Sequence, residues 1–325
     1  MEPPAVRFFA VGTLASALSL AVALGLSGCA APEVAPGSPA GSHSPEATAT
    51  PAPGAGATTA PTPTRVDLSA ELAAIESRYG VTVGVSARST TGVEVEHRAS
   101  DRFGYASTLK VFAAALLLAT TSPEQRAATL TWTQADVDTA GYSPVTGEHI
   151  DSGLTLAELA EAAVRRSDNT ALNLVLTAVG GPDALQGFLR TLGDDSTMVG
   201  AFEPELNTVT SGDPANTTTP SAYRAALQRV FDEGVLSDAD AATLRQWMSG
   251  NATGDTLIRA GAPEGWIVAD KSGGAGGIRN DIARVTTPEG EEIDVVVLTA
   301  TVDPAAPSDD AAVAETSRVV LDAMR

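Results

Sequence analysis

The chain has 325 residues, with 40 acidic and 20 basic side chains and a formal net charge of −20. Binding of phosphate groups needs clustered cations, so this charge balance argues against nucleic acid as a partner. The single cysteine, Cys29, excludes a disulfide framework and a cysteine-based metal site, and an apolar core must therefore stabilise the fold.

The N-terminal segment has the pattern of an export signal. Residues 8–28 are apolar and rich in Ala, Leu and Val, with Arg7 before them and Leu26-Ser27-Gly28-Cys29 at their end. This pattern is typical of a lipoprotein signal peptide, which we expect in residues 1–28. Two or more acyl chains on Cys29 would hold the exported protein at the cell membrane or envelope, on its extracytoplasmic side. An uncleaved transmembrane anchor is the alternative for a stretch of about 20 residues.

A tether is expected after the cysteine. Residues 31–64 consist almost entirely of Pro, Ala, Gly, Ser and Thr, a composition that buries too little apolar surface to fold. We therefore assign residues 29–65 to a lipidated cysteine with a disordered tether and residues 66–325 to one folded domain, which is long enough for a sizeable core.

Periodicity divides residues 66–325 into strands at both ends and helices between them. A helical pattern covers 68–78, and strands at 81–89 and 93–97 follow it. Residues 108–120 are apolar nearly all round, which predicts a buried helix. Further helices are expected at 154–166, 169–179, 220–232 and 309–324, and strands at 266–271, 281–286 and 293–301. The order predicts an α/β fold of the α+β sandwich type: a mainly antiparallel sheet flanked by helices, with an inserted all-helical lobe and a cleft between them.

Two lysines stand out in a chain that otherwise draws its cations from arginine. Lys110 and Lys271 are the only lysines among the 20 basic residues. A buried lysine can be tuned toward neutrality and can transfer a proton, whereas arginine cannot. Ser107-Thr108-Leu109-Lys110 places a hydroxyl at the start of the buried helix with an amine one turn later, which is the arrangement of a nucleophile beside a base. An N-capping Ser107, with Lys110 paired to a carboxylate, is the structural alternative.

Three further segments carry side chains suited to chemistry. Ser167-Asp168-Asn169 sets a hydroxyl beside an amide at a helix boundary, where a plain N-cap is the alternative. Lys271-Ser272-Gly273-Gly274 follows a strand, and glycine there permits either a close approach by a ligand or a simple turn. Glu203 and Asn207 lie four residues apart in a loop, close enough to hold one water between them.

Together these segments resemble one enzyme family. The patterns Ser-x-x-Lys, Ser-Asp-Asn, Glu-x-x-x-Asn and Lys-Ser-Gly occur once each, the last three at 60, 96 and 164 residues after Ser107. The ordered set resembles the class A serine β-lactamases of the penicillin-recognising serine hydrolase superfamily. Residues 142–146 and 167–171 are also similar to the family's sequence, and the resemblance runs from about Leu68 to the C-terminus. It implies hydrolysis of the β-lactam ring of penicillins and cephalosporins, and with it antibiotic resistance.

The resemblance also implies catalytic roles, carried over residue by residue. Ser107 would be the nucleophile and Lys110 a partner in its deprotonation. Glu203 would activate the hydrolytic water, and Ser167, helped by Lys271, would pass a proton to the β-lactam nitrogen.

Substrate-binding roles follow from the same resemblance. The backbone N–H groups of Ser107 and Gly274 would form the oxyanion hole. Tyr142 would be a wall of the cleft, although a buried structural tyrosine is the alternative. Asn169 would bind the substrate's side-chain amide, and Asn207 would hold the hydrolytic water. Ser272 and Gly273 would also contact the substrate, and Arg279 would bind its carboxylate.

Two features depart from the family's pattern. The family usually fastens the loop of the catalytic glutamate with an Arg–Asp ion pair, and the corresponding residues here are Ala201 and Asn216. No charge is stranded, and a more mobile loop with altered deacylation is expected. The glycine-rich stretch 273–277 is one residue shorter than in many relatives, so the substrate spectrum cannot be inherited from them.

Other functions remain open at this point. A penicillin-binding D-Ala-D-Ala peptidase shares much of the chemistry but stays blocked by penicillin, and Glu203 with Asn207 argues against it. A non-hydrolytic scaffold of the cell envelope is the second alternative. The three histidines lie in no recognisable catalytic or zinc pattern, so no metal or other cofactor is expected. The expected partners are β-lactam small molecules and, through Cys29, a membrane, and the expected state is a monomer.

Overall fold

The computed structural model describes residues 63–325, and six of its strands form one sheet in the order β1-β3-β2-β10-β9-β8. The strands are β1 (Thr64–Arg65), β2 (Val81–Ser89), β3 (Val93–His97), β8 (Ile267–Ala275), β9 (Ile278–Thr286) and β10 (Glu292–Thr301). All neighbours are antiparallel except β1 and β3. β2 and β10 pair along their length, from Val81 with Thr301 to Ser89 with Ile293. The prediction of a mainly antiparallel sheet built from both ends of the folded part is confirmed.

Side chains on the two faces of the sheet enter two different cores. Val295 and Val297 of β10 belong to a core that also contains Leu72 and Val313, whereas Val296 and Leu298 belong to the core of the helical lobe. Successive residues of a strand point to opposite faces, so a strand buried on both faces is apolar along its whole length. This explains the continuous apolar run in the sequence of β10.

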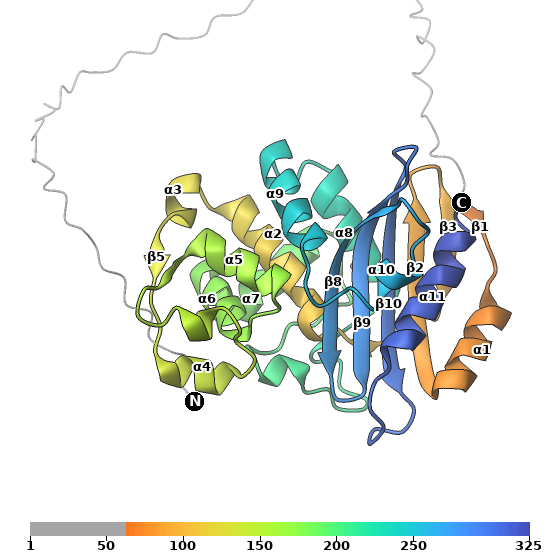
Figure 1. The fold of residues 1–325 in the computed structure, drawn as a ribbon, viewed down its shortest axis with the longest axis horizontal. Coiled ribbons are helices and arrows are strands. Elements are labelled where there is room, and N and C mark those ends of the chain that lie inside the picture. Colours follow the sequence, from red (N-terminus) through yellow and green to blue (C-terminus); the bar gives the residue numbers. More distant parts are fainter. Residues whose placement is uncertain (1–62) are drawn as a thin grey trace, which may run out of the picture. The chain divides into compact units, whose positions relative to one another are not determined.

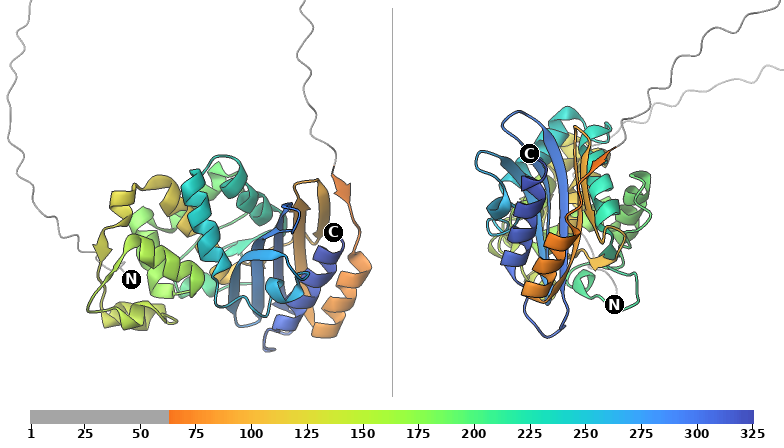
Figure 2. Two further views of the ribbon diagram at one scale, coloured as in Figure 1. Left: turned by 45° about the horizontal axis from the view of Figure 1, so that its top comes forward. Right: turned by 90° about the vertical axis from the view of Figure 1, so that its right-hand side faces the viewer.

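Helices cover both faces of the sheet (Figures 1 and 2). α1 (Ser69–Tyr79) and α11 (Asp310–Asp322) lie side by side on one face with the short α10 (Ile258–Gly261). α8 (Pro220–Asp232) packs on β2 and β10 from the other face. α1 ends at Gly80, whose φ of 62° lies in the left-handed region that glycine adopts without strain.

Apart from α8 and α10, the helices between β3 and β8 form the helical lobe, as predicted, with α2 (Lys110–Thr120) at its centre. α2 contacts α5, α6, α7 and α9, which explains why its sequence is apolar nearly all round. The lobe contains α3 (Pro123–Arg126), α4 (Gln134–Ala140), α5 (Leu156–Arg165), α6 (Asn169–Val179), α7 (Gly181–Thr191) and α9 (Asp238–Ser249), the 3-10 turns η1 (Ala106–Leu109), η2 (Thr146–Glu148) and η3 (Glu205–Asn207), and the strand pairs β4 (Phe103–Gly104) with β7 (Thr217–Thr218) and β5 (Thr129–Leu130) with β6 (Leu154–Thr155).

A buried arginine fastens α8 to the sheet. Arg284 of β9 donates to both carboxylate oxygens of Asp294 on β10, over 2.9 and 2.7 Å, and to Asp232 at the end of α8. Its guanidinium also lies 4.8 Å from the ring centre of Phe231. Because Arg284 is almost fully buried, its charge depends on these partners.

The expected signal peptide, Cys29 and nearly all of the tether lie outside the described residues. Within residues 63–325, no helix is both long enough and apolar enough to cross a membrane.

Candidate active site

The expected nucleophile lies in η1, a 3-10 turn that leads directly into α2. Ala106 precedes Ser107 with a φ of 47°, a strained backbone conformation for a residue with a β-carbon. Residues i and i+3 are eclipsed in a 3-10 helix, so Lys110 comes directly beside Ser107, with Nζ 2.9 Å from Oγ. The helix expected at 108–120 thus begins at Lys110, and the turn that carries the serine is tighter than an α-helix.

Lys110 is completely buried, and five oxygen atoms lie within 3.5 Å of its Nζ. Besides Ser107 Oγ, its Nζ lies 2.8 Å from the carbonyl oxygen of Ser167 and 2.6 Å from Asn169 Oδ1. Glu203 Oε1 is 3.0 Å away. The Ser167 hydroxyl is the fifth neighbour, with Oγ at 3.5 Å. An ammonium group has three protons to donate, so these five acceptors compete for them. Burial lowers the pKa of Lys110, and the Glu203 carboxylate acts in the opposite direction. The arrangement allows Nζ to exchange a proton with the hydroxyl on one side and the carboxylate on the other.

Ser167 is presented by a backbone that its neighbour anchors. Ser167 has a φ of 55°, and Asp168 caps α6 by accepting a hydrogen bond from the N–H of Ala171 over 2.9 Å. The Asp168 carboxylate also accepts from the N–H groups of Val145 and Thr146, both over 2.9 Å, and from the Thr146 hydroxyl over 2.8 Å. The helix cap expected in this segment is therefore Asp168, which leaves the Ser167 hydroxyl to face the two lysines.

The second lysine lies on the other side of Ser167. Lys271 Nζ donates to Ser167 Oγ over 3.1 Å and to the carbonyl oxygen of Ser272 over 2.7 Å. Burial, reinforced by the charge of Lys110, lowers the pKa of Lys271 to about 7. The Nζ atoms of the only two lysines of the chain thus both lie within 3.5 Å of the Ser167 hydroxyl.

Glu203 is buried, and an amide on α6 holds its backbone. Asn173 accepts from the N–H of Glu203 and donates to its carbonyl oxygen, both over 2.9 Å. The Glu203 carboxylate accepts from Asn207 Nδ2 through Oε2, over 2.5 Å, while Oε1 faces Lys110. Sequence reasoning missed Asn173; its signal was an amide one turn after Asn169 in an otherwise apolar helix.

The Lys-Ser-Gly segment belongs to a strand, which corrects the expected boundary. β8 continues to Ala275. The predicted end at 271 was wrong, because glycine is a poor strand residue and the sequence after Ser272 is rich in it. The structure explains the glycine at 273: a β-carbon there would lie 3.0 Å from Thr108 N, 3.0 Å from Tyr105 O and 3.1 Å from Ser107 N. The edge strand therefore runs against the turn that carries the nucleophile.

The expected catalytic and binding residues surround one cavity of about 210 Å³. Its lining comprises Ser107, Tyr142, Ser167, Asn169, Asn207, Thr253, Ser272, Gly273, Gly274 and Arg279. Thr253 was not foreseen; its hydroxyl lies 2.6 Å from Ser272 Oγ. Lys110, Glu203 and Lys271 lie behind this lining, where they are at least 98% buried and reach the cavity through their contacts with it.

The exposure of Tyr142 and the ion pair of Arg279 test the roles expected of these two residues of the cavity wall. Tyr142 is 58% exposed, which excludes the alternative of a buried structural tyrosine. Arg279 pairs through Nε with Asp310 Oδ1 over 2.5 Å, and a β-carbon on Gly274 would lie 3.3 Å from its Nη1. The guanidinium is thus fixed by α11 with one terminal nitrogen toward the edge strand.

Hydrogen bonds of Asn216 hold the loop of Glu203 where the family usually has the Arg–Asp ion pair. Asn216 is buried, and its side chain makes four hydrogen bonds to the loop and to Tyr105. Ala201, the other position of the missing pair, is partly buried against the core of the helical lobe. A more mobile loop remains a prediction, and these four bonds oppose it.

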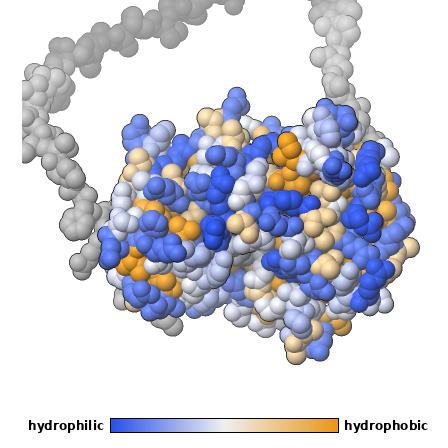
Figure 3. Space-filling model, viewed as in Figure 1, coloured by the Kyte–Doolittle hydropathy of each residue, from blue (hydrophilic) through white to orange (hydrophobic). Residues whose placement is uncertain are grey.

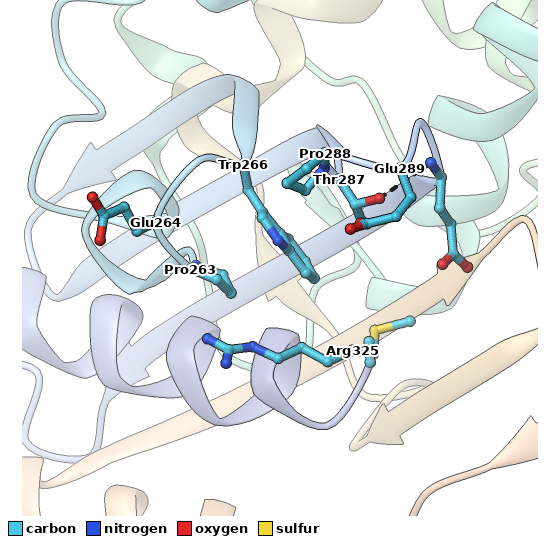
Figure 4. A pocket seen from close by; sticks show the side chains of 9 residues that line it. Pro263, Glu264, Trp266, Thr287, Pro288, Glu289 and Arg325 are labelled. Atoms are coloured by element: carbon cyan, nitrogen blue, oxygen red, sulfur yellow. Dashed lines mark hydrogen bonds between the residues drawn. The ribbon is translucent and has the colours of Figure 1, made fainter.

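A larger cavity, of about 570 Å³, lies elsewhere and lacks the groups for this chemistry. Figure 4 shows Trp266 between Pro288 and Arg325 in this cavity, and the rest of the lining contains no serine, lysine, histidine or cysteine. No group of three or more His, Cys, Asp or Glu in residues 63–325 could hold a metal ion. The smaller cavity is therefore the candidate active site.

Known proteins share this sequence and fold. The model of the Beta-lactamase enzyme family matches residues 67–324. Beta-lactamase FAR-1 of Nocardia farcinica is 42% identical over 259 residues, which cover 79% of this chain and 83% of the relative. A beta-lactamase of Bacillus licheniformis is 39% identical over 262 residues, or 80% of this chain and 85% of the relative. The crystal structure of a class A beta-lactamase from Clostridium kluyveri matches with a TM-score of 0.76 at 41% identity, over 78% of this chain and 97% of that one.

Proposed function

The chain belongs to the class A β-lactamases, and on this basis we propose that it opens the β-lactam ring through an acyl-enzyme on Ser107. The reaction is hydrolysis of the ring amide of penicillins and cephalosporins, which inactivates these antibiotics and confers resistance. The observation that carries the proposed mechanism is the position of Lys110 Nζ, 2.9 Å from Ser107 Oγ and 3.0 Å from Glu203 Oε1.

In the acylation step, Ser107 Oγ attacks the carbonyl carbon of the ring. Lys110 takes the serine proton, directly or by way of Glu203, because burial favours its neutral form. The C–O bond forms, the ring C–N bond breaks, and Ser167 donates a proton to the leaving nitrogen. Lys271 supports that transfer through its 3.1 Å hydrogen bond to Ser167 Oγ. Backbone N–H groups of Ser107 and Gly274 hold the negative charge on the carbonyl oxygen.

In the deacylation step, a water held by Glu203 and Asn207 attacks the ester carbonyl. Glu203 accepts a proton from this water, and the ester bond to Ser107 breaks as the serine recovers its proton. The 2.5 Å contact between Asn207 Nδ2 and Glu203 Oε2 holds the two side chains together, and Asn207 Oδ1, buried without a hydrogen-bond partner among the described residues, is available to accept from this water.

The remaining residues of the cavity bind the substrate in this proposal. Asn169 uses one N–H for the carbonyl oxygen of Ala140, over 2.9 Å, and its second N–H serves the side-chain amide of the antibiotic. Arg279 and Ser272 bind the carboxylate, and the exposed ring of Tyr142 forms a wall at the mouth of the cavity. Gly273 permits the close approach of β8 to the nucleophile.

Stopped-flow hydrolysis of a chromogenic cephalosporin by residues 66–325 tests the mechanism, alongside Glu203→Gln and Ser107→Ala. We expect sustained turnover by the parent, an accumulated acyl-enzyme in Glu203→Gln and no acylation in Ser107→Ala. A single stoichiometric burst from the parent would instead indicate the peptidase, which the family relationship does not favour, and no reaction would indicate a silent scaffold.

We further propose that the mature protein is an extracytoplasmic lipoprotein, anchored through Cys29 by a tether that ends near residue 65. The apolar stretch 8–28 and the cysteine after it support this proposal. Mass spectrometry of the mature N-terminus tests it: a diacylated or triacylated Cys29 is expected, and an unmodified N-terminus beyond Cys29 would refute the anchor.

A monomer is the proposed state of the folded domain. Within residues 63–325 the exposed large hydrophobic side chains are Tyr142, Val209, Ile267 and Val302, and on the face in Figure 3 apolar residues form separate patches among hydrophilic ones. Sedimentation equilibrium tests this state, and a dimer mass would contradict it.

A further inference from the structure

Asn216 occupies the point where the two ends of the Glu203 loop meet. Its N–H donates to the carbonyl oxygen of Met198 over 2.9 Å, and the N–H of Met198 donates to the carbonyl oxygen of Thr217 over 3.0 Å. These bonds close the loop formed by residues 199–215. Asn216 has a φ of 59°, a left-handed conformation that asparagine tolerates better than most residues with a β-carbon. The position therefore suits an asparagine by its backbone alone.

The side-chain amide of Asn216 uses its full capacity for hydrogen bonds. Nδ2 donates to the carbonyl oxygens of Glu205 and Thr208, over 3.1 and 3.0 Å. Oδ1 accepts from the N–H of Gly200 over 3.3 Å and from the Tyr105 hydroxyl over 3.1 Å. An amide offers two N–H donors and two lone pairs, so all four are engaged. Glu205 and Thr208 flank Asn207 on both sides, and the amide thus holds the short turn η3 that carries it.

Tyr105 connects this amide to the nucleophile. Tyr105 is fully buried and lies two residues before Ser107. Its ring stacks on that of Tyr223, with 6.5 Å between the ring centres, and the ring centre of Tyr223 lies 4.7 Å from that of Phe112 in α2. Burial raises the pKa of Tyr105, so its hydroxyl remains a donor over the working pH range. The buried Tyr105 side chain thus connects the nucleophile turn directly to the loop.

We propose that Asn216 and Tyr105 are positioning residues that hold Glu203 and Asn207 in register with Ser107 during deacylation. We call the four hydrogen bonds of the Asn216 side chain, including the one from Tyr105, the clasp. This neutral clasp stands in place of the Arg–Asp ion pair that the family usually has at the ends of this loop. The inference rests on the proposed function, in which Glu203 activates the hydrolytic water.

The chemistry of the clasp distinguishes it from an ion pair. Both acceptors of the Nδ2 group are backbone carbonyls, so a carboxylate at position 216 would oppose two oxygen atoms and lose both bonds. The link to Tyr105 also joins the loop to the nucleophile turn itself. Loss of the clasp should therefore change the relative position of water and acyl group more than the attack by Ser107.

The experiment compares Asn216→Ala, Asn216→Asp, Tyr105→Phe and the double variant Asn216→Ala/Tyr105→Phe with the parent. Acylation is followed by stopped flow with a chromogenic cephalosporin, and the acyl-enzyme is quantified by intact-protein mass spectrometry. We expect kcat of Asn216→Ala to fall about 100-fold, because a displacement of about 1 Å in the reacting geometry has such an effect. Its kcat/KM should fall less than about tenfold, so KM falls and acyl-enzyme accumulates.

The other variants refine the assignment. Asn216→Asp should be impaired at least as strongly. Tyr105→Phe keeps the ring but loses the hydroxyl contacts with Asn216 Oδ1 and the carbonyl oxygen of Met198, and it should lose about fivefold in kcat. The double variant should be no slower than Asn216→Ala, because the two residues act as one unit. Ser317→Ala is the matched control: it removes a buried hydrogen bond of 2.7 Å within α11 and should leave kcat unchanged.

Glu203→Gln in the same assay separates this inference from the proposed function. If Glu203→Gln traps the acyl-enzyme and Asn216→Ala does not, the clasp has no positioning role. An equal loss of acylation and deacylation in Asn216→Ala, or additive losses in the double variant, would also overturn it. If Glu203→Gln itself turns over normally, the proposed role of Glu203 is wrong.

Discussion

Replacement of Gly273 by alanine should damage the site through a single methyl group. The added β-carbon would lie 3.0 Å from Thr108 N, 3.0 Å from Tyr105 O and 3.1 Å from Ser107 N, and all three are backbone atoms. Ordinary contacts are several tenths of an ångström longer, so either β8 or the nucleophile turn must move. β8 cannot move away from the turn on its own, because it pairs with β9, and β9 is bonded to the same segment. Asn280 of β9, the partner of Gly273, donates to the carbonyl oxygens of Gly104 and Tyr105.

The expected cost follows from this confinement. Overpacking of a rigid site typically destabilises a protein by about 1–3 kcal/mol. A shift of the nucleophile by several tenths of an ångström relative to the oxyanion hole should slow acylation. A displacement near 1 Å lowers a rate by about 100-fold, which sets the upper limit of the expected loss. Deacylation should suffer less, because Glu203 is held from α6 by Asn173 and not from β8.

Stopped-flow acylation and guanidinium unfolding of Gly273→Ala measure both effects. Gly187→Ala in α7 is the matched control, because a β-carbon there meets no atom within 4 Å and the residue is exposed. It should stabilise the protein by about 0.5–1 kcal/mol through helix propensity and leave the kinetics unchanged. Parental acylation by Gly273→Ala, with unchanged stability, would refute the reasoning from close contact.

Three other outcomes are expected. Asp168→Ala leaves four donors, three of them buried, without their acceptor and should lower the free energy of unfolding by about 4 kcal/mol. A guanidinium titration that shows less than about 1 kcal/mol would contradict the account of that carboxylate. Lys271 is charged below its pKa of about 7, so kcat/KM for an anionic penicillin should fall as pH rises through that value, and Lys271→Arg should move the fall to higher pH. A flat profile in the parent would contradict a role for the charged form of Lys271 in the reaction. Asp294→Ala removes two hydrogen bonds of the buried Arg284, which keeps Asp232 as a partner, and should destabilise the protein by about 3 kcal/mol, whereas Asp294→Ala/Arg284→Met should recover part of the loss in thermal unfolding.

The fold was predictable where local pattern and tertiary environment agree. Periodicity predicted β2 and β3 with their observed ends, because polar turn residues bound both strands. It also predicted the buried helix α2, because a helix surrounded by other helices is apolar on every side. Periodicity ended β8 too early, at 271, because glycine has a low strand propensity, whereas the close contact of β8 with the nucleophile turn requires glycine at 273.

The site was predictable as a set of motifs and less so as a set of contacts. The resemblance indicated Ser107 and Lys110, and the structure supplies the tight 3-10 turn that brings their side chains together. No local pattern indicates that Asn173 holds the backbone of Glu203, or that the Tyr105 hydroxyl reaches Asn216, because these partners are 30 and 111 residues apart in the sequence. Such contacts depend on how the helical lobe closes on the sheet.

The order of strands in the sheet has a consequence for when activity can arise during biosynthesis. β10 separates β2 from β9, so the early and late strands join only through a segment that is among the last to be made. A nascent chain that has Ser107 but lacks β10 has no sheet edge in place against the nucleophile turn, and such non-local pairing is slow to form. A chain exported in the unfolded state would therefore stay chemically silent until nearly all of it had emerged.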